Sequence, residues 1–127
     1  MPLYSNSVPP SAVAKGLDVV IVSAEQLGAG NFSSRAAIGA DRNNFDDPIT
    51  LTFTYATVPS SVEYDIYVAF DDSAGITNYA YTNLKTTNVN GDQVTIQRAA
   101  TGGINFRFVC VKEVTSPGVN ATVTVRK

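Results

Sequence analysis

The sequence predicts an all-β fold, an antiparallel sandwich of two sheets built from about eight short strands. Polar and apolar residues alternate in short segments such as Thr-Leu-Thr-Phe-Thr-Tyr at residues 50–55. Because strand side chains repeat every two residues, such a segment buries one face and leaves the other in water. Stretches rich in Gly, Pro, Asn, Asp and Ser separate these segments and favour turns. No segment sustains the helical apolar period of about 3.6 residues.

The predicted strands, in chain order, cover residues 17–24, 33–39, 49–55, 62–70, 76–84, 93–98, 104–114 and 121–126. The first contains the strand-sized apolar run Val-Val-Ile-Val, whereas the second shows weaker alternation. The third and fourth alternate throughout, so that in the fourth Tyr64 and Ile66 share one face and Tyr67 lies on the other. Strands with one apolar face need a covering second sheet or closure into a barrel, and we favour the two-sheet sandwich.

The last four strands show the same pattern with one exception. In the fifth, Tyr79 and Tyr81 share a face, and in the sixth and eighth Val or Ile alternates with Thr or Gln. The seventh is apolar on both sides, with Phe108 and Cys110 on one face and Val109 on the other. We expect it to be central in its sheet or to present one face to an interface. The predicted core contains Phe53, Ile66, Val68, Phe106, Phe108 and Val123.

The chain divides into an extended N-terminal arm, residues 1–16, and a single β-sandwich domain, residues 17–127. Its 127 residues suffice for one domain with a core of its own. Charged residues make up 16% of the chain, well below the roughly 25% typical of soluble domains. A polar but weakly charged surface suits a protein that packs against other subunits.

The predicted arm is interrupted by prolines and glycine and does not alternate, which indicates an irregular segment. It nevertheless carries apolar side chains that a solvated tail has no reason to keep. These are Leu3, Tyr4, Val8 and Val13. We expect the arm to dock on its own domain or on a neighbouring subunit, and these four residues are candidate partner-binding residues.

The absence of histidine argues against an enzyme. Histidine is the side chain best placed to move protons near neutral pH and the commonest metal ligand, so most hydrolase triads and zinc sites are excluded. The single cysteine, Cys110, is in phase with two aromatic residues and is expected to fill the core. We therefore expect no catalytic residues, no cofactor and no required metal.

Acidic clusters occur at Asp71-Asp72 and at Asp46-Asp47, with Asp41 nearby. Carboxylates in loops bind hard cations such as calcium, and Asp71-Asp72 with Asn78 is the best such group. Their spacing does not match an EF-hand, and aspartate in a turn usually accepts hydrogen bonds from its own backbone. We expect the turn role.

Charge and hydropathy exclude two classes of partner. The formal net charge is −2 and the basic residues are scattered, whereas nucleic-acid binding depends on clustered Lys and Arg. No stretch approaches the roughly 18 consecutive apolar residues that span a bilayer. We expect neither a nucleic-acid nor a membrane partner.

Tyr67 is the most promising surface residue. If Tyr64 and Ile66 fill the core, Tyr67 lies on the outer face together with Asp65, where a carbohydrate or a second subunit can reach it. The alternative is a tyrosine that only stabilises a cross-strand pair.

In overall style the chain resembles the small capsid decoration, or cement, proteins of tailed bacteriophages. The resemblance lies in the N-terminal arm at residues 1–16, the low charge, the Thr-, Ala- and Asn-rich strands and the missing catalytic residues. It implies binding to the major capsid protein and to sister copies, as trimers or dimers, and stabilisation of the shell. It also implies a location on the virion surface after synthesis in the host cytoplasm, in keeping with an N-terminus that lacks a secretory signal.

Two other functions remain open. One is a carbohydrate- or receptor-binding domain of a phage tail fibre, although the chain lacks tryptophan, the strongest sugar-stacking residue. The other is a bacterial immunoglobulin-like adhesion module, which would normally belong to a longer secreted chain.

Overall fold

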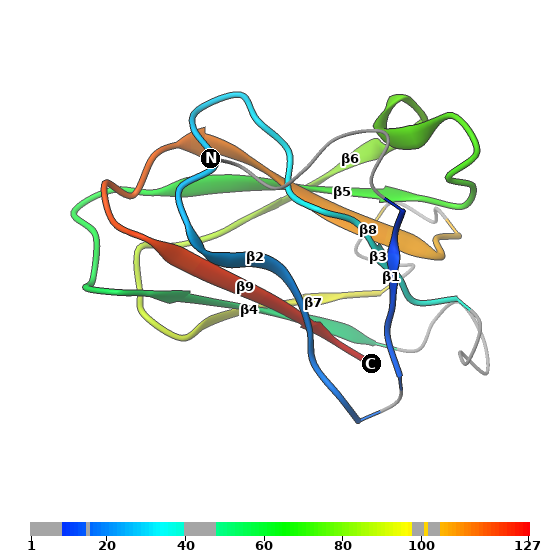
Figure 1. Cartoon of the computed structure of the whole chain (residues 1–127), viewed down its shortest axis with the longest axis horizontal. Coiled ribbons are helices and arrows are strands. Elements are labelled where there is room, and N and C mark those ends of the chain that lie inside the picture. The colour runs from blue at the N-terminus through cyan, green and yellow to red at the C-terminus, as the bar shows by residue number, and fades with distance from the viewer. Residues whose placement is uncertain (1–8, 15, 40–47, 98–100, 102–104) are drawn as a thin grey trace.

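The protein is a sandwich of two sheets that pack face to face (Figure 1). The computed structural model describes residues 9–14, 16–39, 48–97, 101 and 105–127. The strands are β1 (Ser11–Ala12), β2 (Val19–Glu25), β3 (Ala36–Ala37), β4 (Ile49–Tyr55), β5 (Glu63–Ala69), β6 (Ala80–Lys85), β7 (Asp92–Ile96), β8 (Phe108–Thr115) and β9 (Ala121–Arg126). One short 3-10 turn, η1 (Gly75–Asn78), precedes β6.

Each sheet places side by side strands that are far apart in the sequence. One sheet has five strands in the order β1-β3-β8-β5-β6, and the other has four in the order β2-β9-β4-β7. Neighbouring strands are antiparallel throughout, except for the parallel pair β1 and β3. The all-β, two-sheet prediction is therefore confirmed. Among the described residues, no helix is long and apolar enough to cross a membrane.

The main core lies between the sheets and follows the predicted alternation. Phe53, Ile66, Val68, Phe106 and Val123 are fully buried. The ring centroids of Phe53 and Tyr64 lie 5.5 Å apart in the interior. These rows of every second side chain are the apolar faces that each sheet hides from water, and their burial is the main favourable contribution to folding.

The prediction was wrong for one core residue, Phe108. Phe108 is half-buried on the outer face of the five-stranded sheet, and Val109 and Val111 fill the main core in its place. The reason is local: β8 begins only at Phe108, after a bend at Arg107, so Phe106 and Phe108 do not share one alternating phase.

Several predicted strands are shorter in the structure. The segment 33–39 contributes only two strand residues, and residues 76–78 belong to η1. Gly75 begins this turn with φ at +64°, a conformation that favours glycine, and its N–H donates to the carbonyl of Asp72. The chain therefore reverses direction before β6 begins.

In the described part of the predicted arm, residues 9–14 and 16, strand β1 pairs with β3 at the edge of the five-stranded sheet. The N–H groups of Ser11 and Val13 donate to the carbonyls of Arg35 and Ala37, each at 2.9 Å. Val13 is only 2% exposed and packs in the main core. This burial corrects the expectation that Val13 contacts a partner, because its own domain already covers it. Leu3, Tyr4 and Val8 lie outside the described residues.

Candidate functional site

Three aromatic side chains form a row on the outer face of the five-stranded sheet. Tyr67 on β5 stands directly opposite Tyr81 on β6, and their ring centroids are 5.6 Å apart. Phe32, from the loop before β3, meets the other side of the Tyr67 ring at 5.2 Å in an edge-to-face arrangement. All three side chains are half-buried. We call Phe32, Tyr67 and Tyr81 the aromatic row.

The alternation of β5 explains why Tyr67 points outward. Tyr64, Ile66 and Val68 are fully buried between the sheets, so the intervening side chains occupy the opposite face. The structure thus places Tyr67 where the sequence predicted it. Contacts between its ring and two neighbouring rings restrict its rotamers, and such aromatic pairs contribute about 0.5–1.5 kcal/mol beyond area burial.

Charged side chains flank the aromatic row. Lys85 Nζ donates to Glu63 Oε2 at 2.8 Å and to Asp65 Oδ1 at 3.1 Å, and it lies 5.5 Å from the centroid of the Tyr81 ring. The hydrogen bond to Glu63, followed by those to Tyr81 and Asp65, raises the pKa of Lys85. At the other end, Lys112 Nζ lies 5.6 Å from the centroid of the Phe32 ring. Both distances are within the range of cation–π attraction.

The rings are thus flanked by a band of alternating charge. Asp65 stands opposite Lys85 on one side and Lys112 on the other in the strand register. Because Lys85 is well exposed, its ion pairs contribute little to stability. Burial, followed by the charge of Asp65, raises the pKa of Tyr67, so its hydroxyl is a neutral hydrogen-bonding group at physiological pH.

A small apolar cluster borders the row on the same face. Ala69, Tyr79 and Cys110 are buried there, and Ile76 and Phe108 pack beside them. Burial raises the pKa of the Cys110 thiol and excludes solvent from it, which makes it a poor nucleophile. The structure therefore assigns Cys110 a packing role, on the outer face of the sheet.

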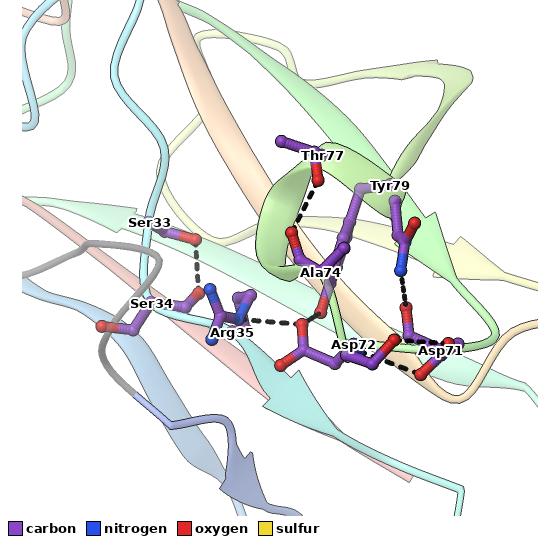
Figure 2. Close-up of polar contacts among 10 residues, drawn as sticks. Ser33, Ser34, Arg35, Asp71, Asp72, Ala74, Thr77 and Tyr79 are labelled. Atoms are coloured by element: carbon purple, nitrogen blue, oxygen red, sulfur yellow. Dashed lines mark hydrogen bonds and ion pairs between the residues drawn. The ribbon is translucent and has the colours of Figure 1, made fainter.

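An ion pair with little exposure to solvent links the segment before β3 to the loop after β5 (Figure 2). Arg35 Nε lies 3.0 Å from Asp72 Oδ1, and the two side chains are only 4% and 12% exposed. The hydroxyl of Tyr79 donates to the same carboxylate oxygen at 2.7 Å. Burial, followed by this hydrogen bond, raises the pKa of Tyr79. The Asp72 carboxylate, in the loop after β5, thus contacts both Tyr79, which follows η1, and Arg35, which precedes β3.

Asp71 has the turn role expected from the sequence. Its carboxylate accepts hydrogen bonds from the N–H and the hydroxyl of Ser73, at 2.9 and 2.8 Å, and these bonds lower its pKa. The amide of Asn78 donates to the Asp71 carbonyl at 3.2 Å. Within the described residues, no group of three or more potential ligands is placed to hold a metal ion. Asp41, Asp46 and Asp47 lie outside the described residues.

A buried carboxylate positions the loop that carries Phe32. Glu113 is fully buried, and its carboxylate accepts hydrogen bonds from the N–H groups of Leu27 and Gly28 at 3.1 and 3.2 Å. The Tyr64 hydroxyl lies 3.5 Å from the same carboxylate. Backbone hydrogen bonds join Glu113 to Gly30 and Asn31 as well, so both the main chain and the side chain of one residue fix this loop.

Sequence reasoning missed three residues of this region. Glu113 is in phase with Val109 and Val111, so alternation alone places a carboxylate in the core and was a usable signal. Phe32 lies in a turn-rich connection and Arg35 in a weakly alternating segment. The sequence around them has no pattern that marks either residue as part of a site. Their roles depend on contacts with β5, β8 and the loop after β5, which lie far away in sequence.

Comparison of the chain with models of protein families, with curated proteins and with solved structures finds no match in any of the three.

Proposed function

We propose that this chain is a non-enzymatic capsid decoration protein that binds the outer surface of a bacteriophage capsid and stabilises the shell. The aromatic row is the surface that contacts the major capsid protein. The observation that supports this proposal best is the row itself, three half-buried rings on the outer face of a sheet. Aromatic residues carry a large share of the binding energy at protein interfaces.

The surroundings of the row favour a protein partner. Contacts with neighbouring rings and with a loop fixed by Glu113 hold the aromatic side chains in place before binding. A preorganised surface loses less conformational entropy on association. The charged band of Asp65, Lys85 and Lys112 forms a polar rim beside the rings, as at many protein interfaces.

Ring geometry weighs against the carbohydrate-binding alternative. Phe32 and Tyr67 are inclined at 69° to one another, and Tyr67 and Tyr81 at 44°. Three rings inclined in this way do not form one flat surface on which a chain of sugar rings could stack. A protein surface, with side chains of varied shape, can fill the spaces between inclined rings.

Co-sedimentation with capsid shells tests the proposal. Capsid shells that carry no decoration protein are incubated with the wild type and with the Tyr67→Ala variant. Loss of an interface hot spot costs about 2 kcal/mol or more, so we expect binding to weaken by a factor of about 30. Thr52→Ala, on the outer face of the other sheet, is the matched control and should bind like the wild type.

Far-ultraviolet circular dichroism and thermal melting establish that both variants are folded. Equal binding by Tyr67→Ala and the wild type would show that the aromatic row does not contact the capsid. Failure of the wild type to bind the shells, combined with saturable binding to an immobilised glycan that Tyr67→Ala abolishes, would favour the carbohydrate-binding function.

A further inference from the structure

The four sheet edges of this sandwich are protected very unequally. An edge strand presents unpaired backbone N–H and C=O groups, and proteins normally protect it with prolines, charges, bulges or short length. Here the edges are β1 and β6 in the five-stranded sheet and β2 and β7 in the four-stranded sheet.

Three of these edges carry such protection. The β1 edge has only two strand residues and follows Pro9 and Pro10. The β2 edge is irregular, with two register shifts against β9 and a positive φ of 49° at Ala24. The β6 edge combines a positive φ of 66° at Asn83 with the charged Lys85.

The β7 edge has the least protection of the four, since its only such device is one charge, Asp92, at the start of the strand. Its five residues, Asp-Gln-Val-Thr-Ile, pair with β4 in one unbroken register and include no proline, glycine or lysine. Among the described residues, no strand pairs with its other side. Its outward side chains, Gln93 and Thr95, are exposed and uncharged. β7 is therefore a regular strand with an open edge, uncharged beyond Asp92.

We propose that β7 pairs antiparallel with β7 of a second copy of this chain across a two-fold axis. Alternation limits the possible registers, because outward side chains must stay on the outer face of the joined sheet. The register centred on Val94 satisfies this condition and pairs the whole strand. It places Gln93 opposite Thr95 of the partner subunit, and Asp92 opposite Ile96 of the partner subunit.

Charge and hydropathy favour a second copy as the occupant of this edge. The proposed register brings no like charges opposite one another, since Asp92 is the only charged residue of β7 and faces an isoleucine. Val94 packs only partly against the main core, and pairing would cover it with Val94 of the partner subunit. The two four-stranded sheets would join into one continuous sheet. Assembly of two copies does not depend on capsid binding.

Sedimentation velocity of the full chain tests this inference. We expect the wild type to be a dimer whose dissociation constant rises at least about tenfold in the double variant Gln93→Lys/Thr95→Lys, because like charges then face each other across the axis. The matched control is Val20→Lys/Ala80→Lys, which adds the same charge at exposed positions on the β2 and β6 edges. This control should remain a dimer.

A charge-swap experiment tests the register. Gln93→Glu/Thr95→Glu should weaken the dimer by a similar factor, and mixing it with Gln93→Lys/Thr95→Lys should give a mixed dimer as tight as the wild type or tighter. A wild type that is monomeric up to millimolar concentration would overturn the proposal. The proposal would also be overturned if the wild type were a monomer and Gln93→Lys/Thr95→Lys abolished its binding to capsid shells. That result would indicate that β7 pairs with a strand of the capsid protein. Sedimentation tests the dimer, whereas capsid binding by Tyr67→Ala tests the proposed function, so the two claims can fail independently.

Discussion

The two outer faces of the sandwich are both built from alternating strands, but they carry very different side chains. The face of the five-stranded sheet carries the aromatic row, a charged band and a loop fixed by a buried ion pair. The face of the four-stranded sheet carries mainly threonines, in cross-strand pairs such as Thr52 with Thr124 and Thr54 with Thr122. Its outward threonines are Thr50, Thr52, Thr54, Thr95, Thr122 and Thr124.

Contacts on the threonine face join directly paired strands and are mostly neutral. Gln93 Nε2 donates to Thr52 Oγ1 at 3.4 Å, and Thr54 Oγ1 donates to the Thr122 carbonyl at 3.2 Å. The ion pair there, Arg126 with Asp18, is about half exposed at the rim. Loops from distant parts of the chain gather on the aromatic face instead. The difference indicates that the candidate site combines two strand residues, Tyr67 and Tyr81, with loops that the sheet supports.

Breaking the buried ion pair should give the largest effect. Asp72→Ala removes the carboxylate that faces the buried Arg35 guanidinium, and loss of one partner of a buried pair costs about 3–5 kcal/mol. Urea unfolding measures this loss. Asp71→Ala, one residue away and exposed, should cost about 1 kcal/mol or less, because it removes only turn hydrogen bonds. Equal losses in the two variants would mean that the ion pair does not fix this face.

Shortening the N-terminal segment should have an intermediate effect. Deleting residues 1–13 removes β1 and the buried Val13, and loss of one fully buried valine side chain alone costs about 1.5–3 kcal/mol. Deleting residues 1–8 is the control and should cost less, because the pairing of Ser11 and Val13 with the sheet remains. Thermal melting compares the two. Identical melting temperatures would show that β1 adds nothing to the five-stranded sheet.

The threonine face should be the least sensitive. Thr52→Ala removes one side of the cross-strand pair with Thr124 and should change the free energy of unfolding by only about 0.2–1 kcal/mol. Thr124→Ala and the double variant complete a mutant cycle that isolates the pair. A coupling energy above about 2 kcal/mol would contradict the view that this face is held only by weak local contacts.

Alternation was a reliable guide wherever a strand is long and unbroken. β4, β5 and β9 begin and end within one residue of their predicted limits, and their inward residues are buried as expected. The same rule placed Tyr67 outward. It did not place Phe108, because the bend at Arg107 changes the phase just before β8. The extent of 33–39 also departed from the pattern, since backbone hydrogen bonds with distant segments decide its conformation. The turn at 76–78 departed for a local reason, the positive φ of Gly75 and hydrogen bonds between residues three apart.

The sequence alone determined the fold class, the core side of most strands and the outward direction of Tyr67, because these depend on a two-residue period that is local to each strand. The tertiary structure alone decided that Phe32 and Tyr81 join Tyr67, that Arg35 pairs with Asp72, and that Val13 belongs to the core. The physical reason is sheet order: strands that are neighbours in space are mostly distant in sequence. Side-chain clusters formed across them therefore leave no periodic signal along the chain.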